Sequence, residues 1–252
     1  MEQLLFHQDA SIGHIILNRP KQRNALSLSL LYSLQELLLK LKHNKNINVV
    51  IIKGNGPDFC SGHDLNELYG PDLDIDHFRK IFSVCTEVML SLHDLPQPVI
   101  AQVQGVATAA GCQLVAACDL AVASSDVRFA TPGVKLGLFC TTPMVPLSRT
   151  IGRKRALEML FTGRYISAKE AMNFGLVNRI VDKEKLEEET LMLAQEIAQY
   201  SPYTISLGKK AFYDQIEKNE PLAYTYAKEV IAMNCTSNVA QKGIKSHLDK
   251  HK

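Results

Sequence analysis

The sequence contains no tryptophan, no Cys-x-x-Cys pair and almost no excess of charge of either sign. Its 28 basic and 26 acidic residues leave a formal net charge of +2 at pH 7, which provides no electrostatic footprint for nucleic acid or for an anionic membrane surface. The six cysteines lack the spacing of a metal site or a redox pair, so we expect reduced thiols and no bound metal. A hydrophobic fraction of 46% excludes a disordered chain.

The first residues, MEQLLFHQDASIGH, lack the pattern of a signal peptide or a transit peptide. The sequence therefore predicts a cytoplasmic protein, or one of the mitochondrial matrix if a leader has been removed. One uncharged stretch, residues 95–118, is long enough to cross a bilayer. Its prolines, glutamines and glycines favour a buried strand, turn and helix instead, and we expect no membrane partner.

Short apolar strands alternate with amphipathic helices along most of the chain. The predicted strands are 14–17, 49–52, 99–103, 120–123 and 177–181. The main predicted helices are 28–42, 77–92, 110–118, 185–200, 202–217 and 221–233, followed by a basic tail. This alternation predicts an α/β fold. The change to purely helical sequence near residue 185 divides the chain into a core, 1–184, and a C-terminal helical segment for docking or assembly, 185–252.

Two short loops after buried strands offer backbone N–H groups. The first, residues 59–64, follows the strand at 49–52, and the second, residues 105–112, follows the strand at 99–103 and opens a helix. Amides at a helix N-terminus are unpaired donors, and the helix dipole there favours negative charge. Two such donors aimed at one point would form an oxyanion hole. For each loop taken alone, tight packing of small residues is the alternative.

Four motifs, in this order, resemble those of the crotonase (enoyl-CoA hydratase/isomerase) superfamily. They are LNRPKQRNALS, FCSGHDLNEL, PVIAQVQGVATAAGCQLVAACDLAVAS and ALEMLFTGRYISAKEAMNFGLVNRIV. The similarity covers about residues 13–250, and GHDL, AAGCQL and FATPG are most similar to the subgroup of enoyl-CoA hydratase domain-containing proteins of type 3. The resemblance implies a crotonase-like spiral of ββα units with a C-terminal helical segment.

The resemblance also implies a substrate and a site. The substrate would be an acyl-CoA or enoyl-CoA thioester, with coenzyme A as part of the substrate and no separate cofactor. By motif position, the amides of His63 and Ala110 would hold the thioester oxygen and stabilise an enolate, and removing one such donor typically costs roughly 10²–10³ in rate. Loop residues implied in binding are Ser61, Gly62, Asp64 and Gly111. Family members commonly form homotrimers or dimers of trimers.

Both glutamates that the hydratases use are absent. Their positions fall on Gln113 and Gly133. A glutamine can hydrogen-bond a water but cannot take its proton at neutral pH, and a glycine has no side chain to offer. General acid–base groups contribute roughly 10²–10⁴ each, so we expect standard hydratase activity to be weak. Simple isomerases fit no better, because they commonly use a glutamate near the second position.

Other residues are candidates for acid–base work or for lining the acyl pocket. His63 has the right ordinary pKa range for a base, although a loop histidine facing solvent or CoA is the alternative. Cys140 lies in the wall near the acyl group, where a packed thiol is favoured over a nucleophile. Asp64 is expected to brace its loop, and Asp119 to bind backbone at a strand entry. Glu67 and Glu87 are neighbouring carboxylates for which a solvated face is expected.

The CoA phosphates need cations or polar groups. The candidates are Arg19 and Lys21 near the N-terminal loop, Asn66 where the family often has lysine, and Lys209, Lys210, Lys245 and Lys250 from the helical end, for which plain surface charge is the alternative. Two functions remain open. The chain is either an enzyme acting on an acyl-CoA as a lyase, isomerase or hydrolase, or a non-catalytic acyl-CoA sensor or partner in lipid metabolism.

Overall fold

The computed structural model describes residues 2–250 of the chain. The strands of this part are β1 (Leu4–Asp9), β2 (Ile12–Leu17), β3 (Val49–Gly54), β4 (Val99–Val103), β5 (Val106–Thr108), β6 (Leu120–Ser124), β7 (Arg128–Ala130), β8 (Ile166–Ser167) and β9 (Arg179–Val181). Its α-helices are α1 (Leu28–Lys42), α2 (Ile75–Asp94), α3 (Ala110–Ala117), α4 (Met144–Ile151), α5 (Arg153–Thr162), α6 (Ala168–Phe174), α7 (Leu186–Ala198), α8 (Pro202–Ile216), α9 (Glu220–Thr236) and α10 (Asn238–Asp249). The predicted strands and helices therefore form, with ends that differ by a few residues.

The main sheet has six strands in the order β1-β2-β3-β4-β6-β9. β1 is antiparallel to β2, and all other neighbouring strands are parallel. The parallel strands β3 and β4 are almost continuous apolar runs and are buried nearly throughout. Such runs are typical of parallel strands that are covered on both faces.

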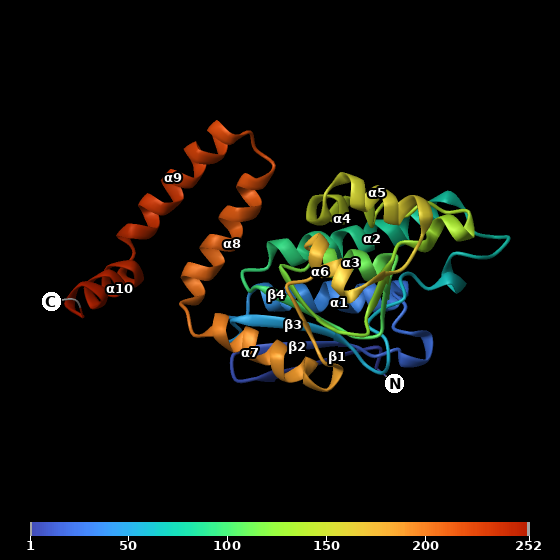
Figure 1. Ribbon diagram of the computed structural model, residues 1–252, viewed down its shortest axis with the longest axis horizontal. Coiled ribbons are helices and arrows are strands. Elements are labelled where there is room, and N and C mark those ends of the chain that lie inside the picture. Colours follow the sequence, from blue (N-terminus) through green and yellow to red (C-terminus); the bar gives the residue numbers. More distant parts are fainter. Residues whose placement is uncertain (1, 251–252) are drawn as a thin grey trace.

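Helices cover both faces of this sheet (Figure 1). Val50 and Ile52 of β3 belong to the main core together with the buried leucines of α1. Val49 and Ile51 face the other way and pack with Leu186 of α7 in a second cluster, because successive strand residues point to opposite faces. Within the predicted C-terminal segment, 185–252, α7 thus packs on the sheet and completes the core.

Three short strands form a second sheet in the order β5-β7-β8. The chain passes from β4 into β5 at Gly105, whose φ is +62°. A Cβ there would overlap the carbonyl oxygen of Pro57, so only glycine fits this corner. β7 follows β6 after three residues and pairs in parallel with β5. β4 and β6 are thus each followed by a short strand and then a helix.

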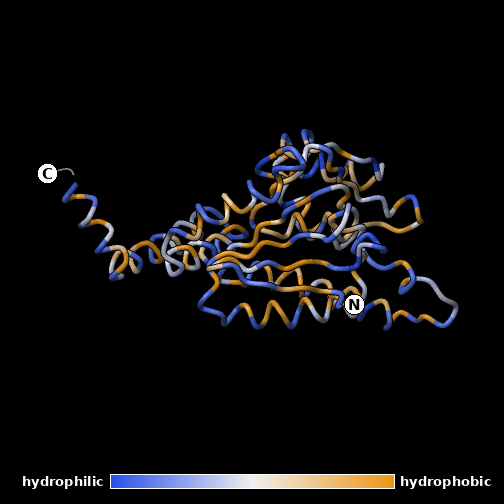
Figure 2. The backbone as a smooth tube through the Cα atoms, turned by 90° about the horizontal axis from the view of Figure 1, so that it is seen from below, coloured by the Kyte–Doolittle hydropathy of each residue, from blue (hydrophilic) through white to orange (hydrophobic). Residues whose placement is uncertain are grey.

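The last three helices project from this body as an arm (Figure 1). α8, α9 and α10 contain no buried apolar residue within the described range. The arm shows mixed polar and apolar colouring, whereas the strands of the body are mainly apolar (Figure 2). The sequence after residue 233, where we predicted no helix, completes α9 and forms α10. None of the helices in residues 2–250 is long and apolar enough to cross a membrane.

Candidate active site

The two loops singled out from the sequence lie side by side. The backbone N–H of Cys60 donates to the carbonyl of Val106 (3.1 Å), and the N–H of Thr108 donates to the carbonyl of Cys60 (3.0 Å). The Thr108 hydroxyl also donates to the carbonyl of Ser61, at 3.0 Å. The first loop therefore runs parallel to β5 and brings His63 towards the start of α3.

Glycines allow this close approach. Gly62 has a φ of +105°, and a Cβ there would lie 2.9 Å from the Cβ of Ala109 and 3.3 Å from the amide nitrogen of Ala110. A Cβ at Gly111 would overlap the carbonyl oxygen of Cys60. A side chain at either position would push the two loops apart. These two predicted site residues are therefore important because they have no side chain.

Two amides at this junction make no backbone hydrogen bond. Ala110 is the first residue of α3, and the N–H groups of a helix's first turn have no partner within the helix. In the part of the chain that the structure describes, neither the Ala110 N–H nor the His63 N–H donates a backbone hydrogen bond. The two predicted donors of the oxyanion hole thus lie on adjoining loops.

The residue before α3 is strained. Ala109 has φ +50° and ψ −117°, a backbone conformation that residues other than glycine rarely adopt. Such a conformation typically costs about 1–3 kcal/mol of folding free energy. Its N–H donates to the carbonyl of Ala130 at 2.9 Å, which helps to hold it in place. The strain orients the peptide that carries the Ala110 amide. We did not single out Ala109 from the sequence, although it occupies a glycine position of the family motif.

An ion pair braces the loop that carries His63. Nη2 of Arg19 lies 2.7 Å from Oδ2 of Asp64, and the other carboxylate oxygen accepts from the backbone and side-chain nitrogens of Asn66 (3.1 and 2.9 Å). Burial alone would raise the pKa of Asp64, but the hydrogen bonds from Arg19 and Asn66 outweigh it and lower the pKa. All three were predicted as CoA or substrate contacts, and in the structure Asp64 binds both Arg19 and Asn66.

Two other predicted cations lie elsewhere. Lys21 is exposed in a short 3₁₀ helix, Pro20–Gln22, close to Ser61, whose N–H donates to the carbonyl of Arg23. Lys250 ends α10, far along the arm from the two loops (Figure 1). Only a neighbouring copy could bring a residue at that end to the site.

Lys209 is not a surface cation. It is buried in an ion pair with Asp119, with 2.6 Å between Nζ and Oδ2, so it cannot meet a phosphate. The same carboxylate oxygen accepts from the N–H of Val99 at 2.7 Å, which confirms that Asp119 binds backbone at a strand entry. Lys210 instead pairs with Asp214 on the surface.

The His63 side chain is partly buried between the loop and α2. Its ring lies edge-on to Phe82, with 5.1 Å between centroids. Nε2 is buried and has no hydrogen-bond partner among residues 2–250. Burial lowers the pKa of His63 to about 4, because the charged form loses hydration. The imidazole is therefore neutral at physiological pH and is a weak base.

Two further polar atoms at the site lack partners. Gln113 lies on the first turn of α3, and its Oε1 is buried and unpaired within the described residues. The fully buried hydroxyl of Thr131 is unpaired in the same sense, and the pairing of Thr108 with Ala130 places it near the start of α3. Buried polar groups without partners are costly, so both atoms are suited to a ligand or water. Nothing in the sequence distinguished Thr131.

A thiol occupies the space in front of Gly133. A Cβ at Gly133 would lie 2.9 Å from Sγ of Cys140 and 3.0 Å from the carbonyl oxygen of Leu138. Burial raises the pKa of Cys140, although a hydrogen bond from the Gly133 backbone opposes this. Cys140 is therefore a packed thiol that fills the place where a side chain at 133 would begin. It is a poor nucleophile, because the thiolate is the reactive form.

The neighbouring glutamates have other roles. Glu67 accepts from the N–H of Leu28 at the start of α1, at 2.7 Å. Glu87 accepts from Gln35 at 2.6 Å on an exposed part of α2. Neither replaces the carboxylates missing at Gln113 and Gly133.

This fold and pair of loops define a class of protein. The model of the enoyl-CoA hydratase/isomerase family matches residues 7–252, and the chain belongs to that family. A solved enoyl-CoA hydratase of Mycobacterium smegmatis superposes with a TM-score of 0.97 at 43% identity, covering 99% of this chain and 97% of the other. The α/β crotonase-like fold predicted from the motifs is confirmed.

The relatives also confirm the predicted subgroup. The mitochondrial enoyl-CoA hydratase domain-containing protein 3 of Rattus norvegicus is 46% identical over 245 residues, 97% of this chain and 81% of the relative. The crystal structure of the human protein of this type superposes with a TM-score of 0.96 at 45% identity, covering 100% of this chain and 99% of the other.

Proposed function

We propose that the protein binds an acyl-CoA thioester and holds its carbonyl oxygen between the amides of His63 and Ala110. The observation that carries this proposal is the pair of N–H groups that donate no backbone hydrogen bond, on two loops that approach each other closely at Gly62 and Gly111. Preorganised donors of this kind stabilise the negative charge that develops on the thioester oxygen. Enolate chemistry at the α and β carbons then becomes accessible.

The acid–base groups limit the reaction. Gln113 can orient a water but not deprotonate it, Gly133 contributes no side chain, and the neutral His63 ring is a weak base with a pKa of about 4. We therefore propose that standard hydration of an enoyl-CoA is slow. Oε1 of Gln113, Nε2 of His63 and the Thr131 hydroxyl are left to bind water or the acyl group. A non-catalytic acyl-CoA sensor is the second candidate, favoured by the absence of both carboxylates.

Turnover and binding must be measured separately. The purified chain is titrated with crotonyl-CoA, a 3-enoyl-CoA and a saturated acyl-CoA by calorimetry, and each reaction is followed in parallel. Turnover above that of Gln113→Ala supports the enzyme, and tight binding with no such turnover supports the sensor. No binding of any thioester rejects both.

The oxyanion hole has its own test, independent of turnover. Two donors lower the stretching frequency of the bound thioester carbonyl, which infrared difference spectra of a ¹³C-labelled acyl-CoA measure. Gly62→Ala brings a methyl group within 3.3 Å of the Ala110 nitrogen and should abolish most of the shift. Gly208→Ala on α8, where a Cβ meets nothing within 4 Å, is the matched control and should retain it. An unshifted carbonyl in the bound wild type rejects the hole.

We also propose that the arm docks on other copies of the chain, in a homotrimer or a dimer of trimers. The support is that α9 and α10 expose apolar side chains. They include Leu222, Tyr224, Ile231, Met233, Ile244 and Leu248. Sedimentation of the full chain tests this, and a monomer at micromolar concentration would reject it.

The mitochondrial names of the relatives support a proposal that the protein acts in the mitochondrial matrix rather than in the cytoplasm. Fractionation of cells that express the natural gene product, with matrix and cytosolic marker proteins as controls, tests this. Recovery in the cytosolic fraction would reject it.

A further inference from the structure

The peptide between Ala109 and Ala110 carries one of the two proposed oxyanion donors. Its carbonyl accepts from the N–H of Gln113 at 3.0 Å, which is the first hydrogen bond of α3. The N–H of a trans peptide points away from its carbonyl, so the Ala110 N–H points out of the helix. On the same turn, Oε1 of Gln113 is buried and has no partner among residues 2–250. The start of α3 thus combines a free donor and a free acceptor.

The chain is held firmly on both sides of this peptide. On one side, the N–H of Ala109 donates to the carbonyl of Ala130 at 2.9 Å. On the other, Gly111 lies so close to Cys60 that a Cβ would overlap the Cys60 carbonyl oxygen. Between these two points the peptide plane has one remaining motion, a rotation through about 180° that leaves both Cα atoms in place. Such a flip would turn the Ala110 N–H away from the site and the carbonyl towards it.

The backbone strain at Ala109 favours the flipped orientation. Its φ is +50° and its ψ is −117°, and a flip would change ψ by about 180°, to roughly +60°. Residues with a side chain can adopt that combination, because it lies in the allowed left-handed α region. Loss of the hydrogen bond from Gln113 opposes the flip, and the two effects are of similar size. Without a further restraint, both orientations would therefore be populated.

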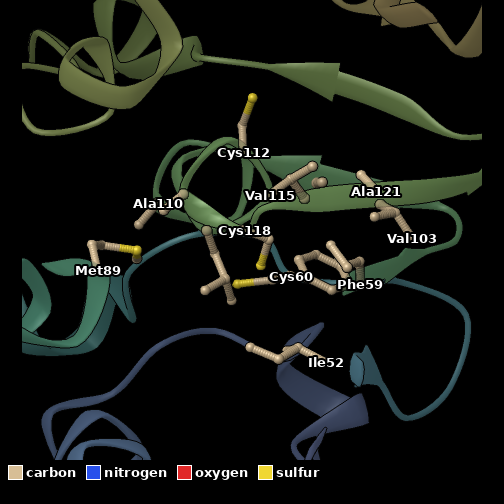
Figure 3. Close-up of a cluster of buried hydrophobic side chains, with 14 of the residues drawn as sticks. Ile52, Phe59, Cys60, Met89, Val103, Ala110, Cys112, Val115, Cys118 and Ala121 are labelled. Carbon is tan, nitrogen blue, oxygen red and sulfur yellow. The ribbon is translucent and has the colours of Figure 1, made fainter. Parts of the chain in front are cut away.

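The methyl group of Ala110 supplies this restraint. Ala110 is the first residue of α3 and has a negative, helical φ. A flip would move that φ from roughly −60° to roughly +120°, which drives the Ala109 carbonyl oxygen against the Ala110 Cβ. A glycine would tolerate this change, because it has no Cβ. Ala110 is also fully buried in the main core next to Met89 of α2 (Figure 3), so the residue cannot turn to avoid the contact.

We propose that Ala110 is a positioning residue, whose methyl group locks the 109–110 peptide with its N–H directed at the thioester oxygen. The oxyanion hole is then formed before a ligand binds, and Ala109 stays strained because the lock prevents its relief. The inference rests on the proposed function, since the thioester is what the locked donor would meet. A ligand binds more weakly in proportion to the fraction of protein that is not in the competent state. The lock should therefore strengthen binding of acyl-CoA but not of free CoA, which has no acyl carbonyl.

The sequence permits a site-specific test by nuclear magnetic resonance. Its Ala-Ala pairs are 109–110 and 116–117, so alanine labelled with ¹³C at the carbonyl and ¹⁵N at the amide gives correlated signals from Ala110 and Ala117 alone. Ala117 serves as an internal control on the same helix. In Ala110→Gly the 109–110 peptide is observed with ¹³C-alanine and ¹⁵N-glycine, and in Ala109→Gly with ¹³C-glycine and ¹⁵N-alanine. Relaxation dispersion measures exchange of this peptide between orientations on the μs–ms timescale.

Affinity is measured by calorimetry with butyryl-CoA and with free CoA. The proteins compared are the wild type, A110G, A109G and the double variant. Ala116→Gly is the matched control, because it places a glycine in α3 away from the flipping peptide.

We expect the 109–110 peptide to show no exchange in the wild type or in A109G, and to exchange in free A110G. A110G should bind butyryl-CoA about three- to tenfold more weakly than the wild type, with unchanged affinity for CoA. The double variant should recover most of that loss, because a glycine at 109 is not strained and no longer drives the flip. A116G should bind both ligands like the wild type.

Exchange of the Ala110 amide in the free wild type would overturn the inference. So would an A110G variant that shows no exchange, or one that binds butyryl-CoA as tightly as the wild type. If the wild type binds no butyryl-CoA, the proposed function fails, whereas exchange in free A110G still decides whether the methyl group locks the peptide.

Discussion

Gly133→Glu would place a carboxylate where the motif resemblance puts the second glutamate of the hydratases, and we expect Cys140 to obstruct it. A Cβ at Gly133 lies 2.9 Å from Sγ of Cys140 and 3.0 Å from the carbonyl oxygen of Leu138. Overpacking of this kind typically costs about 1–3 kcal/mol. The nearest obstacle is the end of a side chain, so Cys140→Ala should relieve most of the cost, whereas the carbonyl contact remains.

A double-mutant cycle measures this coupling. The free energy of unfolding is determined in urea for the wild type, G133E, C140A and the double variant. We expect G133E to lose about 2 kcal/mol in the wild-type background and less than about 1 kcal/mol in the C140A background. Cys235→Ala, which removes an exposed thiol, is the control and should leave the loss unchanged. Equal losses in all backgrounds would refute the packing argument.

The same variants test why hydration should be slow. Adding Gln113→Glu to the Gly133→Glu, Cys140→Ala pair supplies both carboxylates. We expect hydration of crotonyl-CoA to rise at least 10²-fold over the wild type, because each acid–base group contributes roughly 10²–10⁴. A triple variant that binds crotonyl-CoA as tightly as the wild type but hydrates it no faster would show that the missing carboxylates do not limit the rate.

Three further predictions concern stability. The pKa of His63 is lowered from 6.5 to about 4, so the unfolded chain binds more protons than the folded chain between these pH values. The free energy of unfolding therefore falls as the pH falls through this window, by about 2 kcal/mol at pH 5 relative to pH 8. Urea unfolding of His63→Gln should show a pH dependence that is smaller by this amount. Ala109→Gly should stabilise the protein by about 1 kcal/mol, since relief of a backbone strain of about 1–3 kcal/mol exceeds the added entropy of the unfolded chain; a lower melting temperature would contradict the strain. Lys209→Met should cost about 3 kcal/mol, because it leaves the Asp119 carboxylate without its cation, whereas Lys210→Met, at an exposed pair, should cost less than about 1 kcal/mol; equal losses would show that the Lys209 pair does not anchor α8.

The first helix of the arm is attached to the body at Asp119. Lys209 and Tyr213 lie on α8 and both contact Asp119, which follows α3. The start of the proposed assembly arm is therefore attached to the body through this carboxylate. Loosening this attachment should therefore weaken the association of copies.

The sequence alone determined the family, the main strands and the two loops. Buried parallel strands such as β3 are continuous apolar runs, which can be recognised from the local sequence alone. The motifs also assigned Gln113 and Gly133 to the positions of the missing glutamates, because a motif with fixed spacing aligns residue by residue. Asp119 was correctly expected at a strand entry for the same local reason.

Only the tertiary structure decided which segments meet. The strands β5, β7 and β8 contain two or three residues each, too few for a period of two to be detected. Arg19 was a candidate for CoA but pairs with Asp64, 45 residues away in sequence, and Lys209 is buried against Asp119, 90 residues away. The contact between Gly133 and the Cys140 thiol likewise arises from packing between separate elements. Local sequence sets which conformations a segment favours, whereas the partner of a charge or the neighbour of a glycine depends on contacts that form only when distant segments fold together.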